Sequence, residues 1–281
     1  MNCFLKKWGA IIPNFAILIF MIKKILLILL SIFFFLYLGF GSLLFISQNS
    51  FFYPADKTAF DACPAFEKAE KIKSGDFRAY FLKRSSEKVV VYYHGNGGRA
   101  CDRAYMETYF EPREYSVLYV EYPGYAENAE TSMEKILDEV SLVNDFLTKQ
   151  AFKEVIVVGE SVGSGPAAYQ VSLFEKSINK LILITPYNNM ASVAAFHYPL
   201  YPMSILVRNN FRPDLWIKNT TVPVVLILAE NDEVVGFKQG EKLSDDISSN
   251  NKKVYVVKGA GHNSIYGMQE FASIFSEVIG K

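Results

Sequence analysis

Six short β-rich runs, separated by segments with helical spacing, constrain the fold of this 281-residue chain more than any other feature. Each run is continuously apolar rather than alternating, which is typical of strands buried on both faces of a parallel sheet. Strands that alternate with helices build an α/β fold in which helices cover both faces of a mostly parallel sheet. The expected strands are residues 89–93, 117–120, 155–158, 181–184, 224–228 and 254–257.

Two of the intervening segments show clear helical spacing. Apolar residues recur every three or four positions over 133–147, behind the Thr131-Ser132 pair as the expected N-cap, and again over 271–278. The connection from 186 to 222 is too long for a plain crossover and is rich in aromatic residues, so we expect a small cap there. Helices that simply pack on the sheet are the alternative. We therefore expect one domain over 48–281 that carries a cap-like insertion.

An uncharged run of 22 residues, 25–46, is long enough to cross a membrane. At about 1.5 Å per residue it just spans a hydrocarbon core of about 30 Å. Lys23 and Lys24 precede it, which predicts a cytoplasmic N-terminal segment, 1–24, with the bulk of the chain on the non-cytoplasmic side. A cleaved signal peptide is the alternative, but its apolar core is normally about 7 to 15 residues and a small-residue cleavage site follows it. We expect an uncleaved anchor, and we hypothesise that translation begins at Met21 rather than at the first residue.

Charge and cysteine content narrow the classes of partner and cofactor. Lys plus Arg and Asp plus Glu balance at 29 each without a long basic run, which argues against nucleic acid as the main partner. The three cysteines fit no metal spacing and no dense disulfide framework. Cys63 and Cys101 are able to pair in an oxidising compartment, although the sequence alone favours buried, unpaired thiols.

The sequence Gly159-Glu-Ser-Val-Gly163 lies where the expected strand 155–158 passes into a helix. A serine displayed at the top of a sheet needs a sharp turn in a strained backbone conformation, and small residues on either side leave room for it. A glycine-rich turn with an ordinary N-cap serine is the alternative. The pattern predicts that Ser161 is a nucleophile.

Two further residues complete an arrangement that activates a serine. A serine hydroxyl is a weak nucleophile unless a base takes its proton and an acid orients that base. His262 lies in a glycine-rich loop after the last expected strand, and Asp232 follows the strand before it. The order Ser161, Asp232, His262 is that of α/β-hydrolases. Glu230 and Glu233 are alternative acids. We predict Ser161, Asp232 and His262 as the catalytic residues.

The loop His94-Gly-Asn-Gly-Gly98 follows the strand 89–93 and predicts an oxyanion hole. Backbone N–H groups must point at the negative oxygen of a tetrahedral intermediate, and glycines leave room for that approach. We expect one donor from Val162, the residue after the nucleophile, and the second from Asn96 or Gly97. The alternative, a phosphate-binding loop, lacks the required lysine and glycine pattern.

Together these motifs resemble the Bem46-like branch of the α/β-hydrolase superfamily. The resemblance covers nearly the whole segment after the apolar run, although Pro123 and Ala126 stand where many relatives have Arg and Gly. It implies a serine hydrolase tethered by one N-terminal helix and an acyl-ester substrate presented at a membrane. It is carried by His94-Gly-Asn-Gly-Gly98, Glu121-Tyr-Pro-Gly-Tyr125, Gly159-Glu-Ser-Val-Gly163, Asn231-Asp232 and Gly261-His262-Asn263, with Phe51-Phe-Tyr-Pro54 and the segment 211–216.

The sequence therefore predicts a membrane-anchored serine hydrolase of carboxylic esters or thioesters with the α/β-hydrolase fold. Aromatic residues of the insertion, Tyr187, Phe196 and Tyr198, are the expected substrate-binding residues and favour an apolar acyl group. The mechanism requires no metal and no organic cofactor. An amidase or peptidase that uses the same residues is one alternative, and a catalytically idle, membrane-tethered scaffold is another.

Overall fold

The computed structural model of the protein describes residues 2–54, 56–126, 130–248, 250 and 252–280, with side chains described from residue 17 onward. Residue 1, one of the two start residues considered above, lies outside them. The chain divides into two units, residues 1–47 and 48–281.

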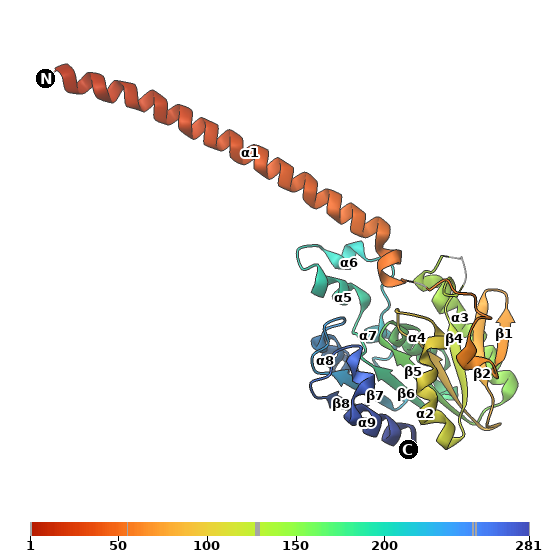
Figure 1. Cartoon of the computed structure of the whole chain (residues 1–281). Helices are drawn as coiled ribbons and strands as arrows, with labels where there is room; N and C mark the ends of the chain where they lie inside the picture. Colours follow the sequence, from red (N-terminus) through yellow and green to blue (C-terminus); the bar gives the residue numbers. More distant parts are fainter. Residues whose placement is uncertain (1, 55, 127–129, 249, 251, 281) are drawn as a thin grey trace. The chain divides into compact units, whose positions relative to one another are not determined.

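In the described residues, an eight-stranded sheet forms the centre of the unit 48–281 (Figure 1). Its spatial order is β1-β2-β4-β3-β5-β6-β7-β8. Strand β2 is antiparallel to β1 and β4, and every other neighbouring pair is parallel. The strands are β1 (Glu70–Ser74), β2 (Phe77–Leu82), β3 (Lys88–Tyr93), β4 (Ser116–Glu121), β5 (Glu154–Glu160), β6 (Lys180–Ile184), β7 (Val224–Ala229) and β8 (Lys252–Val257).

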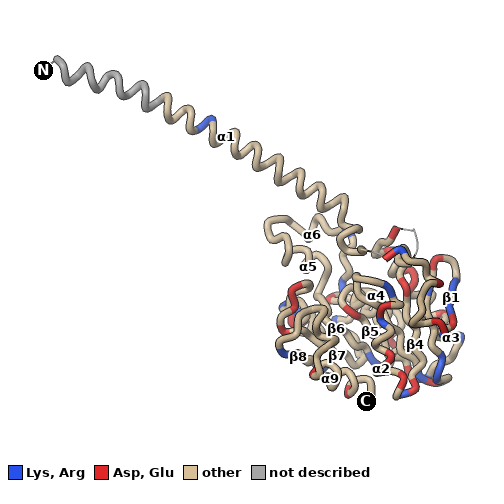
Figure 2. Tube along the Cα trace, viewed as in Figure 1, with Lys and Arg blue, Asp and Glu red and all other residues tan. Residues whose placement is uncertain are grey.

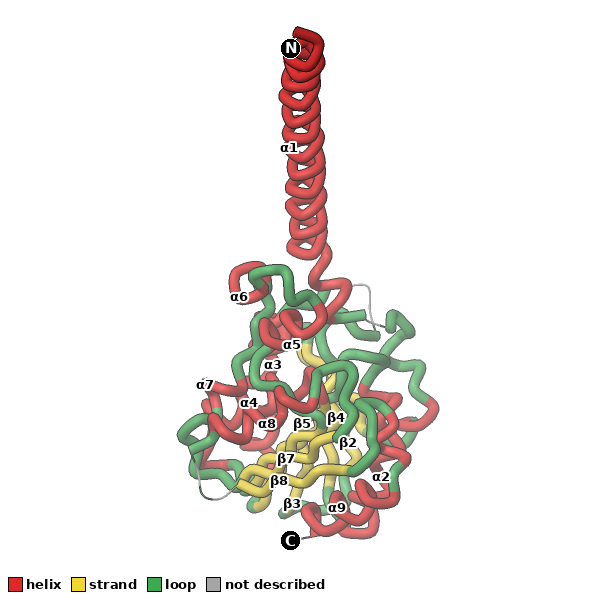
Figure 3. Tube along the Cα trace, turned by 90° about the vertical axis from the view of Figure 1, so that its left-hand side faces the viewer, coloured by secondary structure: helices red, strands yellow, loops and turns green. Residues whose placement is uncertain are grey.

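Helices cover both faces of this sheet (Figure 3). Alternate residues of one strand enter different cores: Val89, Val91 and Tyr93 pack in the core with α3 and α4, whereas Val90 and Tyr92 pack in the core with α2 and α9. Both faces of a central strand are therefore dry, which explains its continuous apolar run. The main helices are α2 (Glu107–Phe110), α3 (Met133–Gln150), α4 (Ser164–Phe174), α8 (Phe237–Asp246) and α9 (Gln269–Gly280).

The predicted fold class is confirmed: the chain has the α/β-hydrolase fold, with a mostly parallel sheet. The hairpin β1–β2 was not predicted from the sequence. Strand β1 is charged and largely exposed, whereas β2 is buried on both faces: Phe77, Ala79 and Phe81 pack in one core and Tyr80 packs in the other. Charged residues interrupt both strands, Lys71 and Lys73 in β1 and Arg78 in β2, so neither strand is a continuous apolar run like those of the central strands.

The helix start predicted before residue 133 is confirmed in detail. The Ser132 side chain accepts a hydrogen bond from the backbone N–H of Lys135 at 3.3 Å, which satisfies one free donor of the first turn of α3. Along α3, Ile136, Val140 and Val143 are fully buried against the sheet. Helix α3 thus packs on the same face of the sheet as α4, the helix that follows the serine turn.

The insertion 186–222 contains α5 (Met190–His197), α6 (Met203–Leu206) and α7 (Pro213–Trp216). Phe211 is buried in the core. By contrast, Ile205 of α6 is 77% exposed. The segment therefore combines residues that pack on the domain with residues that present apolar surface.

Two amide side chains at the start of the unit 48–281 hold this insertion in place. The Gln48 amide donates to the carbonyl oxygen of Leu206 at 3.2 Å, and its oxygen accepts from the backbone N–H of Arg208 at 2.7 Å. The Asn209 amide donates to the Asn49 side-chain oxygen at 2.6 Å. The first residues of the domain and the end of α6 therefore form one hydrogen-bonded group.

Cys63 and Cys101 form a disulfide, with an S–S distance of 2.00 Å. The preference for unpaired thiols was therefore wrong. The two residues are 38 positions apart in the sequence, and only the packing of the segment before β1 against the helix after β3 brings them together. Disulfides persist in oxidising compartments and are rare in the cytosol of most cells.

Helix α1 (Asn2–Phe52) contains the predicted 25–46 segment and continues to Phe52. From Ile17 to Phe52 it is long and apolar enough to span a membrane, with a mean hydropathy of 2.6 over its most apolar window. Lys23 and Lys24 interrupt an otherwise uncharged surface over the described side chains of this helix (Figure 2).

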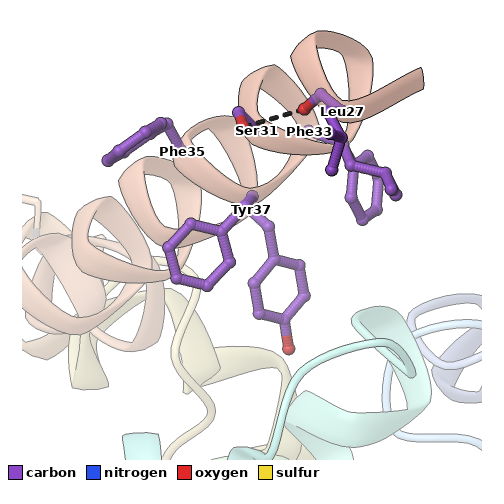
Figure 4. Close-up of a pocket in the computed structure, with 7 residues that line it drawn as sticks. Leu27, Ser31, Phe33, Phe35 and Tyr37 are labelled. Atoms are coloured by element: carbon purple, nitrogen blue, oxygen red, sulfur yellow. Dashed lines mark hydrogen bonds between the residues drawn. The ribbon is translucent and has the colours of Figure 1, made fainter. Parts of the chain in front are cut away.

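The side chains of α1 suit a lipid environment. Phe33, Phe35 and Tyr37 project outward from the helix (Figure 4), and the first two are 64% and 70% exposed. In the same view, the Ser31 hydroxyl donates a hydrogen bond to the carbonyl oxygen of Leu27 at 2.8 Å. A polar group in hydrocarbon must find such an internal partner.

Candidate active site

Ser161 lies at the turn between β5 and α4, as the first residue of a single 3-10 turn, Ser161–Gly163. Its φ angle is +50°, in the left-handed region that side chains other than glycine rarely adopt. Such a conformation costs about 1–3 kcal/mol and persists only where the surrounding structure enforces it. The strain displays the hydroxyl at the carboxyl end of the sheet.

Close backbone packing enforces this turn. A Cβ atom on Gly163 would come within 2.2 Å of the carbonyl oxygen of Tyr93 on β3. A Cβ atom on Gly159 would come within 2.6 Å of the carbonyl oxygen of Gly163. Both positions therefore require glycine, and they bring the serine turn against the end of β3.

The structure brings Ser161, His262 and Asp232 together in one line of hydrogen bonds. Nε2 of His262 lies 2.9 Å from Oγ of Ser161, and Nδ1 of His262 lies 2.8 Å from Oδ2 of Asp232. All three residues are less than 10% exposed. A proton is therefore able to pass from the serine to the imidazole while the carboxylate holds the ring.

The loop after β7 fixes the carboxylate of Asp232. Its Oδ1 atom accepts hydrogen bonds from the backbone N–H groups of Val234, Val235 and Gly236, at 3.0, 2.7 and 3.2 Å. Burial by itself would raise the pKa of Asp232, but the hydrogen bond and charge of His262 and the backbone donors hold that pKa below its ordinary value. The group therefore stays ionised at neutral pH.

The two alternative acids occupy other places. Glu233 accepts the backbone N–H of His262 at 3.1 Å and so supports the histidine loop from outside. Glu230 accepts from the backbone N–H of Gly259 at 2.8 Å and from Nζ of Lys258 at 2.9 Å. Neither carboxylate occupies the position that Asp232 holds beside the imidazole.

The predicted oxyanion residues belong to two segments, the serine turn and the loop after β3. Val162 follows Ser161 in the turn, and its carbonyl oxygen accepts a hydrogen bond from Tyr187 Oη at 3.2 Å. The carbonyl oxygen of Asn96 accepts from Tyr125 Oη at 2.9 Å. These bonds hold the carbonyl groups of both segments. Gly97 borders open space, because a Cβ atom there would have no neighbour within 4 Å.

His94 is buried beneath this loop rather than displayed in it. Its Nδ1 lies 2.6 Å from the carbonyl oxygen of Gly95 and its Nε2 lies 3.2 Å from the Glu121 carboxylate. Its ring stacks on Tyr122 with the centroids 4.1 Å apart, and the Tyr122 hydroxyl donates to the His94 carbonyl oxygen at 2.7 Å. These contacts fix the loop after β3.

The three predicted substrate-binding residues have different surroundings. Tyr187 is fully buried, and its hydroxyl donates a hydrogen bond to the carbonyl oxygen of Val162. Phe196 is 53% exposed and lies 3.6 Å from where a Cβ atom on Gly236 would be, near the Asp232 loop. Tyr198 is half-buried just after α5.

A charged pair beside Ser161 was not found from the sequence. Arg103 donates to both oxygens of Glu160, from Nε at 3.0 Å and from its terminal nitrogen at 2.8 Å. Tyr92 Oη also donates to Glu160, at 3.0 Å. The signal was the acidic residue next to the serine, but its partner lies 57 positions away and only the fold identifies it.

In the part of the chain whose side chains are described, no group of three or more His, Cys, Asp or Glu residues is arranged to hold a metal ion.

The backbone at Ala126 shows the effect of one difference from the Bem46-like motifs. Ala126, at a position where many relatives have glycine, adopts a φ of +58°. The loop after β4 therefore keeps a left-handed residue without the freedom of glycine.

Comparison with known proteins supports this fold. No family model matches the chain. A lysophosphatidylserine lipase, ABHD12, of Macaca fascicularis is 26% identical over 230 residues, which cover 70% of this chain and 57% of that protein. The chain spans less than two thirds of the length of the curated relatives it matches.

Solved structures show the same architecture. An α/β hydrolase from Vibrio vulnificus superposes with a TM-score of 0.65 at 17% identity, over 83% of this chain and 91% of that one. An esterase from Pyrococcus furiosus gives 0.61 at 18% identity, over 80% and 95%. These likenesses show that the chain has the α/β-hydrolase fold. The proteins it is similar to include a putative esterase/lipase of Mycoplasma pneumoniae, 27% identical over 44% of this chain and 47% of that protein.

Proposed function

We propose that this protein is a membrane-anchored serine hydrolase that cleaves carboxylic ester or thioester bonds of acyl, lipid-like substrates. The observation that carries the proposal is the hydrogen-bonded line from Ser161 through His262 to Asp232, at a serine held with a φ of +50°. A buried carboxylate, a correctly placed imidazole and a displayed hydroxyl are the parts that acyl transfer needs.

In the proposed reaction Ser161 attacks the acyl carbon while His262 takes its proton. The resulting oxyanion is received by the backbone N–H of Val162 and by that of Asn96 or Gly97. His262 then gives the proton to the leaving alcohol or thiol as the carbon–oxygen or carbon–sulfur bond breaks. Water, activated by the same imidazole, releases the acid from the acyl-enzyme. Asp232 holds the imidazole and stabilises its charged form throughout.

The anchor and the compartment form the second part of the proposal. Helix α1 contains a segment long and apolar enough to span a membrane, and Lys23 and Lys24, which precede the uncharged run 25–46 within it, favour a cytoplasmic N-terminus. The Cys63–Cys101 disulfide independently supports a catalytic domain on the non-cytoplasmic, oxidising side. We also assign the chain to the Bem46-like branch, whose motifs it resembles.

The substrate class is proposed from the apolar surface of the insertion and from the relatives. Phe196 and Ile205 present exposed apolar side chains, as expected where a long acyl group is received. A relative named as a lysophosphatidylserine lipase acts on an acyl lipid, which agrees with this class.

A chain-length series tests the proposal. The full chain in detergent micelles is assayed with p-nitrophenyl esters from acetate to dodecanoate, with Ser161→Ala as the control variant. We expect kcat/KM to rise with acyl length and the control to be inactive. A flat or falling profile contradicts the acyl-lipid class. Faster cleavage of a matched p-nitroanilide indicates an amidase, and a folded but inactive chain indicates an idle scaffold.

A further inference from the structure

The first part of the insertion presents an uncharged and partly apolar surface. Residues 186–207 contain no Asp, Glu, Lys or Arg. Leu200 and Ile205 are 78% and 77% exposed, and they are the two most exposed large apolar side chains among the described residues of the unit 48–281. Single apolar residues are common on a soluble surface, whereas a group of them in an uncharged segment marks a surface that meets another molecule or a membrane.

This segment is attached to the chain directly after the proposed anchor. The side chain of Gln48 donates to the carbonyl oxygen of Leu206 at 3.2 Å and accepts from the backbone N–H of Arg208 at 2.7 Å. Gln48 is the second residue after the uncharged run 25–46, so the chain between them spans at most about 7 Å. The polar layer on each side of a bilayer's hydrocarbon core is about 5–8 Å thick. In an anchored chain, α6 therefore lies at the depth of the lipid headgroups.

The attachment is firm because the residues after the anchor are packed into the domain. Helix α1 continues through Phe52, and Tyr53 is buried in the core that includes α3 and α4. The Asn49 amide donates to the carbonyl oxygen of Thr131, just before α3, at 3.2 Å. Helix α6 is therefore unable to leave the membrane surface without breaking these contacts and those of Gln48.

The other end of the segment contacts a loop of the proposed active site. Nε2 of His197, the last residue of α5, lies 2.6 Å from the carbonyl oxygen of Val234. Val234 belongs to the loop that holds Asp232. Strands β5 and β6 are parallel, so the insertion that follows β6 starts at the same edge of the sheet as Ser161. Residues 197–206, which we call the docking segment, thus run from the catalytic edge to the chain after the anchor.

We propose that the docking segment inserts into the bilayer that the anchor spans, with the side chains of Leu200 and Ile205 below the headgroups. A lipid partner is favoured over a protein because the anchor holds the segment at headgroup depth and because the segment has no Asp, Glu, Lys or Arg to desolvate. Tyr198 and Tyr201 suit this position, since tyrosine is enriched where a membrane meets water. This inference rests on the proposed membrane anchor and names the surface through which the proposed enzyme meets its membrane.

Depth-dependent fluorescence quenching in lipid vesicles tests the proposal. The full chain carries Cys3→Ser, which leaves only the disulfide cysteines, and Ile205→Cys labelled with the fluorophore NBD. It is reconstituted into phosphatidylcholine vesicles that contain a nitroxide either on the headgroup or near the start of the acyl chains. The acyl-chain nitroxide should quench the label about twice as strongly as the headgroup nitroxide, or more. Leu200→Cys, labelled in the same way, should give the same result.

Leu173→Cys, in the same Cys3→Ser chain, is the matched control. This leucine is 47% exposed and lies in the last turn of α4, which starts at the serine turn and runs toward the opposite edge of the sheet. Its label should be quenched weakly by both nitroxides, and circular dichroism should show the same fold for all labelled chains.

Quenching at position 205 that is stronger from the headgroup, or no stronger than at position 173, overturns the inference while the anchor stands. Emission that depends on the protein-to-lipid ratio but resists both nitroxides indicates a second copy of the chain on this surface, and also overturns it. A chain that does not float with the vesicles in a density gradient contradicts the proposed anchor and the inference with it. None of these readouts depends on hydrolysis, so a failure of the proposed catalysis is seen separately, in the ester series.

Discussion

Glu139 is a buried acid whose replacement by glutamine should stabilise the fold at neutral and alkaline pH. It lies on α3, is 3% exposed, and neither of its carboxylate oxygens has a hydrogen-bond partner among the described residues. Burial, followed by the charges of Glu121 and Asp76, raises its pKa to about 10, while Arg78 opposes the shift. The carboxyl group is therefore protonated in the folded chain at pH 7.

The magnitude follows from proton linkage. The pKa of Glu139 is about 10 in the folded chain against 4.5 for an unperturbed glutamate, so between these values the folded state holds a proton that the unfolded state has lost. The stability that this proton contributes is fully present below about pH 4.5 and is lost as the pH rises toward 10. Each pH unit in this window costs about 1.4 kcal/mol, so the loss by pH 7 is about 3.4 kcal/mol.

Urea unfolding of the full chain in detergent, followed by intrinsic fluorescence from pH 5 to pH 9, measures this effect. Glu139→Gln keeps the shape and removes the titration, so its advantage in unfolding free energy should grow by about 1.4 kcal/mol per pH unit. Glu134→Gln, at an exposed position on the same helix, should show no such slope. Parallel pH profiles for Glu139→Gln and the wild-type chain would show that Glu139 does not hold a proton in the folded chain.

Three further predictions concern the site and the covalent frame. Asp232→Asn should lower kcat about 10⁴-fold, with the fold intact by circular dichroism, because the imidazole loses its orienting carboxylate. Glu230→Gln, the control, should change kcat less than twofold. Similar losses of kcat in both variants would argue against Asp232 as the catalytic acid. Gly163→Ala should destabilise the chain by about 3 kcal/mol in thermal unfolding, whereas Gly267→Ala, with open space at its Cβ, should be neutral. Replacing both Cys63 and Cys101 with serine should lower the free energy of unfolding by about 4 kcal/mol, because the disulfide is lost. In an alkylation assay, the native chain should take up two fewer alkyl groups than the reduced chain. Equal uptake would exclude the disulfide.

The central strands could be predicted from the sequence because strands that are buried on both faces consist of continuous apolar runs. The sequence also placed Ser161, Asp232 and His262 at the ends of three strands, which the structure brings together. Chain order was informative there because parallel strands end at the same edge of the sheet.

What the sequence did not predict depends on contacts between distant segments. The β1–β2 hairpin lies at one end of the sheet, and charged residues interrupt the apolar pattern of both its strands. The pairing of Cys63 with Cys101 and of Arg103 with Glu160 joins residues 38 and 57 positions apart. No local pattern marks such partners, since the fold alone decides which side chains meet.

The central claim is that Ser161 is an activated nucleophile, and labelling with a fluorescent fluorophosphonate tests it most directly. The full chain in lipid vesicles is treated with the probe beside Ser161→Ala, and folding of both is checked by circular dichroism. We expect strong labelling of the wild-type chain and none of the variant. Absence of labelling on a folded wild-type chain, or equal labelling of the variant, would contradict it.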